Sequence, residues 1–275
     1  MARRPPAPIH DGRFDRPSDG RRDPAADRVP APNARHCEQR SDAATSVEPS
    51  FHSAELASGS IANGSLAGDS DEALEAGRIL FSSECRFVHA AQALDHLPPA
   101  AGPELAFAGR SNVGKSSLLN ALTGRHALAR VSAAPGRTRQ LNFFDLAGRL
   151  MLVDMPGYGY ARAPRDVKAD WQGLMFDYLR GRPTLRRVML LLDARIETKP
   201  ADTAVMELLD RAAVAFQLVL TKIDALKPPA LASKIDQARR LARAHPAALA
   251  DVLPTSSETG AGIPQLRAAL AGLAS

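Results

Sequence analysis

A stretch rich in glycine and serine, GRSNVGKSS at 109–117, has the residue types and the spacing to bind phosphate. Four residues separate Gly109 from Gly114, and Lys115 and Ser116 follow at once. In loops of this pattern backbone N–H groups surround phosphate oxygens, the lysine reaches the β- and γ-phosphates, and the serine hydroxyl coordinates Mg²⁺. Ser117 would line the loop near the α-phosphate. The alternative is a turn that binds no ligand, and the rest of the chain argues against it.

The string TKID at 221–224 indicates which purine such a loop would serve. A carboxylate at Asp224 can accept hydrogen bonds from N1–H and the 2-amino group of guanine together. Adenine offers neither donor, and sites built on such hydrogen bonds reject the analogue by about 10⁴–10⁵. The aliphatic stem of Lys222 can lie along the base while its ammonium reaches the phosphate loop. We therefore expect GTP and GDP rather than ATP.

The string DMPGYG at 154–159 supplies a third element. Asp154 is placed to hold Mg²⁺ through a water molecule, and Gly157 can bring its backbone N–H to the γ-phosphate. A plain turn is the alternative. Tyr158 stands where many GTPases keep a water-orienting glutamine, so we assign no catalytic base and expect slow intrinsic hydrolysis that a partner accelerates.

Two further segments complete the expected site. Residues 124–140, GRHALARVSAAPGRTRQ, lack periodicity and are expected to form a mobile loop, in which Thr138 is the candidate second hydroxyl ligand of Mg²⁺. In TSSETG at 255–260, the backbone N–H groups of Ser256 and Ser257 would contact guanine O6.

Basic residues cluster around the expected loops and suggest an anionic partner. Their alternative role is a solvated surface. They are Arg125, Arg130, Arg137 and Arg139 in the first loop and Arg162, Arg165 and Lys168 after the second. Arg239, Arg240 and Arg243 are expected only to face water.

Short apolar runs that alternate with helix-like segments predict an α/β fold to position these motifs. We expect a mainly parallel six-stranded sheet of the Ras-like P-loop type, with one antiparallel edge strand and helices on both faces. The expected strands are 104–109, two strands within 141–157 joined by a turn at 147–148, and 186–194, 215–224 and 251–257. Two apolar stripes predict helices that pack on the core: Val167, Trp171, Leu174 and Tyr178, and Ile263, Leu266, Leu270 and Leu273.

Composition sets the limits of the domain. The chain has 275 residues, a net charge of +5 and a sequence pI of about 9.5, which weakly favours an anionic partner. Residues 1–77 mix Arg, Asp, Pro and Ala and are expected to be a disordered extension, or alternatively an arm that contacts a partner, ahead of a G domain at 78–275. Cys37 and Cys85 show no paired spacing, and no apolar run is long enough to span a membrane, so a cytoplasmic monomer is expected.

The motifs GRSNVGKSS, PGRTR, DMPGYGYA, TKID and TSSETG together resemble the EngB (YihA/YsxC) family, within the TrmE-Era-EngA-EngB-like P-loop GTPases. The resemblance covers about residues 81–273. It implies Mg²⁺-dependent GTP binding and hydrolysis, a role in large ribosomal subunit assembly through contacts with its rRNA and proteins, and a link to cell division and septation. Thr221 replaces an asparagine common in other GTPases but fits this family. The N-terminal extension has no counterpart in the family core.

Carried onto this sequence, the family pattern implies two sets of site residues. Ser116 and Thr138 would ligate Mg²⁺. The nucleotide would be surrounded by Gly109, Arg110, Ser111, Asn112, Val113, Gly114, Lys115, Ser116, Ser117, Gly136, Arg137, Thr138, Arg139, Gln140, Asp154, Met155, Pro156, Gly157, Thr221, Lys222, Ile223, Asp224, Thr255, Ser256 and Ser257.

Two other functions use part of the same pattern. A metabolic P-loop kinase or ATPase would need an acceptor pocket and an arginine-bearing lid rather than TKID. A nucleotide-dependent scaffold of the division machinery would use the same nucleotide site without acting in ribosome assembly.

Overall fold

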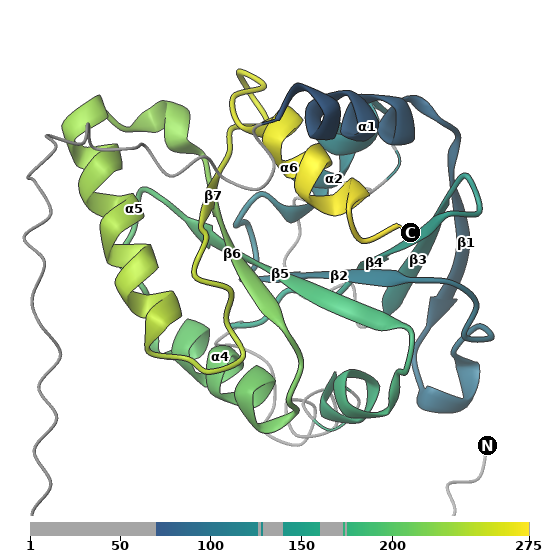
Figure 1. Ribbon diagram of the computed structural model, residues 1–275. Coiled ribbons are helices and arrows are strands. Elements are labelled where there is room, and N and C mark those ends of the chain that lie inside the picture. Colours follow the sequence, from purple (N-terminus) through teal and green to yellow (C-terminus); the bar gives the residue numbers. More distant parts are fainter. Residues whose placement is uncertain (1–69, 126–127, 129–139, 160–172, 174, 275) are drawn as a thin grey trace, which may run out of the picture. The chain divides into compact units, whose positions relative to one another are not determined.

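The computed structural model describes residues 70–125, 128, 140–159, 173 and 175–274. Within them seven strands form one sheet in the order β1-β3-β4-β2-β5-β6-β7 (Figure 1). The strands are β1 (Cys85–Ala91), β2 (Glu104–Gly109), β3 (Leu141–Leu146), β4 (Leu150–Asp154), β5 (Leu185–Asp193), β6 (Phe216–Thr221) and β7 (Leu253–Pro254). The helices are α1 (Asp71–Ser82), α2 (Lys115–Thr123), α4 (Pro200–Arg211), α5 (Pro228–Arg243) and α6 (Ile263–Ala271), with short 3₁₀ turns η1 (Leu94–His96) and η2 (Ile223–Ala225).

The sheet is parallel from β4 through β2, β5 and β6 to β7. Only β3 runs against both of its neighbours, β1 and β4. Because parallel strands end at the same edge of a sheet, the segments that follow β2, β4, β6 and β7 all leave from one edge. These segments carry four of the predicted motifs.

The mainly parallel α/β fold is confirmed, but the sheet has seven strands rather than six, and the antiparallel strand is not at its edge. The additional strand is β1, which pairs with β3 and forms the edge of the sheet on that side. Its sequence, CRFVHAA, does not alternate, and its pairing with β3 shifts register between Phe87 and His89. Phe87 and Val88 are exposed on this edge strand, so burial does not impose the period of two that would have identified it.

Helices cover both faces of the sheet (Figure 1). On one face α1, α2 and α6 bury leucines and phenylalanines against β2 and β3. On the other face α4, α5 and the helical residues 175–181 pack on a second apolar cluster. Of the predicted stripes, Tyr178, Ile263, Leu266 and Leu270 are buried and Leu273 is partly buried. Val167, Trp171 and Leu174 lie outside the described residues.

The fold starts upstream of the boundary expected at residue 78. Ser70 caps α1 by accepting a hydrogen bond from the N–H of Ala73 (3.2 Å), and the helix continues to Ser82. A Cβ at Gly77 would lie 2.6 Å from the backbone nitrogen of Ala268, so α1 and α6 approach each other at a glycine. The first half of this helix falls within residues 1–77, whose composition predicts a disordered extension. The disorder expected for residues 1–69 concerns positions outside the described part.

The predicted turn at 147–148 joins β3 and β4. Ala147 and Gly148 both have positive φ, 55° and 67°, as a two-residue hairpin turn of type I′ requires. Among the described residues, no helix combines the length and the apolar character that crossing a bilayer requires.

Candidate functional site

The loop between β2 and α2 joins a buried strand to a helix N-terminus. Val113 is 4% exposed and anchors the loop to the core beneath it. Gly114 has a φ of 106°, a conformation that favours glycine, and α2 starts at the next residue. Ser116 and Ser117 lie in the first turn of α2, Ser116 half-buried and Ser117 exposed. The unpaired N–H groups and positive dipole of a helix start favour an anion at this position.

Lys115 and Asp154 form an ion pair next to this loop. Asp154 ends β4 and lies opposite Phe107 of the adjacent β2. The side chains of the pair are only 11% and 8% exposed. A lysine ammonium is a point charge on a flexible stem, so it can turn from this carboxylate to a phosphate without movement of the backbone.

The segment after Asp154 runs back along the loop. The N–H of Tyr158 donates to the carbonyl of Gly109, and the N–H of Ser111 donates to the carbonyl of Tyr158, each at 3.2 Å. A Cβ at Gly157 would lie 3.1 Å from the backbone nitrogen of Ser111. Residues 157 and 158 are therefore in direct contact with the first half of the loop.

The side chain of Tyr158 points into the core rather than into the site. It is 6% exposed, and its hydroxyl donates to Asp202 at the start of α4 (3.0 Å). Burial and the neighbouring carboxylate of Asp202 raise the pKa of Tyr158. Asp202 also accepts the N–H of Lys199 (2.8 Å), so one carboxylate joins the start of α4 to the segment after β4.

Two residues at the end of β6 donate hydrogen bonds to the loop between β2 and α2. The hydroxyl of Thr221 donates to the carbonyl of Val113 (2.6 Å). The ammonium of Lys222 donates to the carbonyl of Asn112 (2.6 Å) and to the carboxylate of Asp193 (2.9 Å). The segment expected to read the base is thereby fixed to the loop expected to hold phosphate.

The segments that follow β6 and β7 are bonded to each other. The hydroxyl of Ser256 donates to the carboxylate of Asp224 (2.5 Å), and its oxygen accepts the N–H groups of Glu258 and Thr259. The N–H of Ile223 donates to the carbonyl of Thr255 (3.3 Å). Asp224 itself is exposed, as is Ser257.

Not every predicted site residue joins this group. Gly136, Arg137, Thr138 and Arg139 lie outside the described residues. Gln140 accepts a hydrogen bond from Gln92 and donates to Asn142, next to β1 and β3. Met155 and Pro156 are buried, Met155 within the core, so only the backbone at these two positions can face a ligand.

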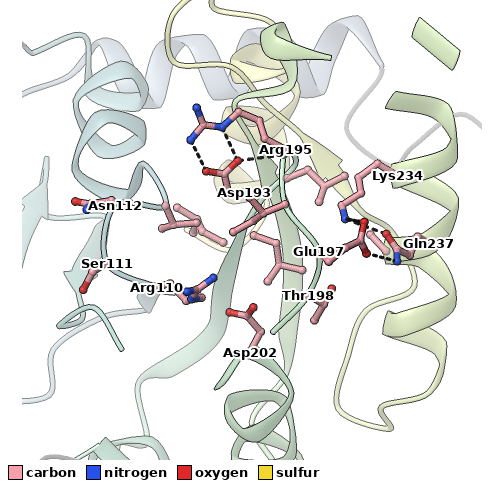
Figure 2. A pocket seen from close by; sticks show the side chains of 16 residues that line it. Arg110, Ser111, Asn112, Asp193, Arg195, Glu197, Thr198, Asp202, Lys234 and Gln237 are labelled. Atoms are coloured by element: carbon pink, nitrogen blue, oxygen red, sulfur yellow. Dashed lines mark hydrogen bonds and ion pairs between the residues drawn. The ribbon is translucent and has the colours of Figure 1, made fainter. Parts of the chain in front are cut away.

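Asp193 and Arg195 are neighbours of the site that sequence reasoning missed. Arg195 holds the carboxylate of Asp193 with two side-chain nitrogens (2.9 and 2.8 Å), as Figure 2 shows. Burial alone would raise the pKa of Asp193, but hydrogen bonds from Arg195 and Lys222 hold it at about 2. The available signal was an aspartate that ends the buried run LLLD on the strand next to TKID.

A cavity of about 220 Å³ adjoins the loop (Figure 2). Its polar lining includes Arg110, Asp193, Glu197, Asp202 and Lys234. Lys234 and Gln237 both contact the carboxylate of Glu197 on one wall.

Comparisons with known proteins agree with this arrangement. Residues 104–222 match a family model described as "50S ribosome-binding GTPase". A probable GTP-binding protein EngB of Granulibacter bethesdensis is 69% identical over 73% of this chain and 90% of its own length. A second, from Gluconobacter oxydans, is 64% identical over 73% of this chain and 88% of its own length.

A crystal structure of a probable GTP-binding protein engB supports the fold alone. It has a TM-score of 0.51 at 23% identity and covers 62% of this chain and 98% of its own. Both relatives named above are described as probable GTP-binding proteins. The chain therefore belongs to the EngB family of GTP-binding proteins and is a GTPase.

Proposed function

We propose that GTP and GDP bind at the edge of the sheet where β2, β4, β6 and β7 end. The observation that carries this proposal is the direct attachment of Lys222 and Thr221 to the carbonyls of Asn112 and Val113. This attachment would fix the distance between a base bound at Asp224 and phosphates bound by the loop. The backbone N–H groups of 109–117 would surround the phosphates, and Ser256 and Ser257 would face guanine O6.

Lys115 is the residue that we assign to the β- and γ-phosphates. Its charge is balanced by Asp154, which holds the ammonium beside the loop. Gly157 would offer its N–H to the γ-phosphate, and its contact with Ser111 supports this assignment. Loss of the γ-phosphate would remove the partner of the Gly157 N–H, which would make the segment after β4 a switch.

Mg²⁺ is proposed as the cofactor of this site. The hydroxyl of Ser116 and the carboxylate of Asp154 are oxygen donors, the type that Mg²⁺ prefers. The described residues contain no group of three or more His, Cys, Asp or Glu placed to hold a metal, so the donors would include the phosphates and a hydroxyl such as that of Thr138. Mg²⁺ would neutralise negative charge on the β- and γ-phosphates.

Slow intrinsic hydrolysis is expected because the hydroxyl of Tyr158 is engaged by buried Asp202 and does not reach the loop. We assign no catalytic base. Single-turnover hydrolysis, measured with the protein alone and with large ribosomal subunits, tests this point, and a fast rate without a partner would refute it.

The cellular role that we propose is assembly of the large ribosomal subunit, with an effect on cell division and septation, by a cytoplasmic monomer. The match to a family described as ribosome-binding supports the partner. Binding to rRNA through basic side chains would weaken steeply as salt is raised. Co-sedimentation with large subunits over a salt series, with GTP and with GDP, distinguishes this role from that of a division scaffold.

The base assignment has a direct test in Asp224→Asn. Loss of two hydrogen bonds to a charged group should weaken GTP by about 10²–10⁴-fold and favour xanthosine triphosphate. The matched control is Asp236→Asn, an exposed carboxylate on α5. An unchanged preference for GTP over xanthosine triphosphate would refute the proposed base pocket.

A further inference from the structure

We propose that Asp193, held by Arg195, is a positioning residue for the nucleotide base, because it fixes the side chain of Lys222 before the nucleotide arrives. This inference rests on the proposed function, in which the stem of Lys222 lies along guanine. Asp193 would touch neither the base nor the phosphates. Its effect would pass through Lys222 alone.

The ammonium of Lys222 has two described partners. One is the carbonyl of Asn112 and the other is the carboxylate of Asp193, at 2.6 and 2.9 Å. A carbonyl is a neutral acceptor, so the carboxylate provides the charge that balances this ammonium. The Lys222 side chain is 29% exposed and that of Asp193 is 7% exposed, which limits the screening of the pair by water.

Asp193 is itself held from several directions. It ends β5 in register with Thr221 of β6, and the N–H of Ala194 donates to the carbonyl of Thr221 (3.0 Å). The backbone N–H of Arg195 donates to the Asp193 carboxylate (3.1 Å), and the guanidinium closes a two-point contact with it. The carboxylate cannot turn away from Lys222 without breaking these bonds.

The three side chains alternate in charge: Arg195, Asp193, Lys222. Figure 2 shows Arg195 folded back onto Asp193 beside Asn112, at the rim of the cavity. Hydrogen bonding to Asp193 raises the pKa of Arg195, and the charge of Asp224 adds to the effect, which places Arg195 in the field of the base-reading carboxylate as well. Because the pKa of Asp193 is about 2, the arrangement persists at every physiological pH.

The physical benefit is pre-organisation. A free lysine side chain has many rotamers, and their loss on binding weakens a complex. When the stem is already ordered against the loop, binding of guanine does not have to order it. Since GTP and GDP share the base, loss of Asp193 should weaken both nucleotides by the same factor and leave the hydrolysis step unchanged.

A double-mutant cycle in the full chain tests the proposal. Affinities for a fluorescent guanine nucleotide, GDP and GTP would be measured for Asp193→Asn, for Lys222→Met and for the double variant. We expect Asp193→Asn to weaken GDP and GTP equally, by about 5–20-fold, with no change in single-turnover hydrolysis at saturating GTP. In the Lys222→Met background the same substitution should have no further effect.

The matched control is Glu197→Gln, a carboxylate bound by Lys234 on another wall of the same cavity. It should leave both affinities unchanged. Asp193→Glu keeps the charge and should recover part of the lost affinity. If Asp193→Asn lowers the folding yield, Arg195→Gln gives a second measurement, since Arg195 is half-exposed and its removal only loosens Asp193. A loss of about 2–5-fold is then expected.

The outcomes separate this inference from the proposed function. If Lys222→Met leaves nucleotide affinity unchanged, the proposed base site itself is wrong. If Lys222→Met weakens binding but Asp193→Asn does not, or if their effects are fully additive, the positioning role is overturned while the base site stands.

Discussion

Two buried ion pairs lie at opposite ends of β2, and their carboxylates differ in the number of described donors that they accept from. At the start of the strand, Glu104 is 1% exposed and accepts from Arg182 at both carboxylate oxygens, at 2.6 to 3.0 Å. The hydroxyl of Tyr178 adds a third donor (3.1 Å). At the other end, beyond the loop, Lys115 makes one ammonium contact with a described residue, the carboxylate of Asp154.

The two ion pairs differ in how firmly their cations are held. The planar guanidinium of Arg182 matches the carboxylate in a fixed geometry, and Tyr178 completes it, so this group locks residues 175–182 onto β2. The ammonium of Lys115 has a flexible stem and lies at a helix start that favours anions. Burial of charge alone therefore does not distinguish the two pairs, whereas the flexible stem of Lys115 beside a glycine loop does.

The largest effect, on the free energy of unfolding, should come from the Glu104–Arg182 pair. Glu104→Gln leaves the Arg182 guanidinium buried without its counter-charge, which should lower the free energy of unfolding by about 3–5 kcal/mol. Urea denaturation measures this change, and nucleotide affinity of the folded protein should not change. The control is Glu75→Gln, which removes the solvent-exposed pair with Arg78 and should leave the free energy of unfolding almost unchanged. Equal losses for both variants would contradict the comparison.

An intermediate effect is expected at the other end of β2. Lys115→Met should weaken GTP by about 10- to 150-fold, the loss of a hydrogen bond to a charged group, as measured by nucleotide titration. It should destabilise the fold less than Glu104→Gln, because the N–H groups at the start of α2 partly replace the lost positive charge near Asp154. Lys234→Met, which removes a lysine paired with Glu197, serves as the control. Unchanged GTP affinity would end the assignment of Lys115 to phosphate.

The smallest effect should follow from Tyr158→Phe. Asp202 loses one donor but keeps the N–H of Lys199, so the free energy of unfolding should fall by only about 1 kcal/mol. Intrinsic GTP hydrolysis should stay within about twofold of the parent rate, because the hydroxyl lies in the core. Thermal unfolding and single-turnover kinetics check the two parts. A tenfold loss of rate would show that Tyr158 takes part in the reaction.

Local patterns predicted much of the fold. The strand 104–109, the helix that ends before Gly124, the turn at Ala147 and the stripe on α6 each carry their own signal, in apolar runs, capping residues or helical spacing. β1 was missed because an exposed, bulged edge strand needs no regular alternation. The start of α1 was missed because the disordered extension expected from composition reached residue 77, although the N-cap Ser70 and the acidic first turn mark a helix start.

The candidate site likewise contains residues that a local pattern predicts and residues whose role depends on contacts between distant segments. Gly114, Lys115 and Asp224 were predicted because their chemistry follows from spacing within a short motif. The ion pair between Asp193 and Lys222 forms because β5 and β6 are adjacent in the sheet. No short stretch of sequence reveals which strands are adjacent. The direction of the Tyr158 side chain depends in the same way on Asp202, a residue of a later helix.

The contact between α1 and α6 has a consequence for biosynthesis. The first and last helices of the described fold meet where Gly77 lies against the backbone of Ala268. While the chain is being translated, α1 emerges before α6 has been made, so the cluster around Leu80 and Phe81 lacks its α6 residues at that stage. That half of the core therefore closes only when α6 can fold onto α1, and the apolar face of α1 lacks this cover in the nascent chain until then.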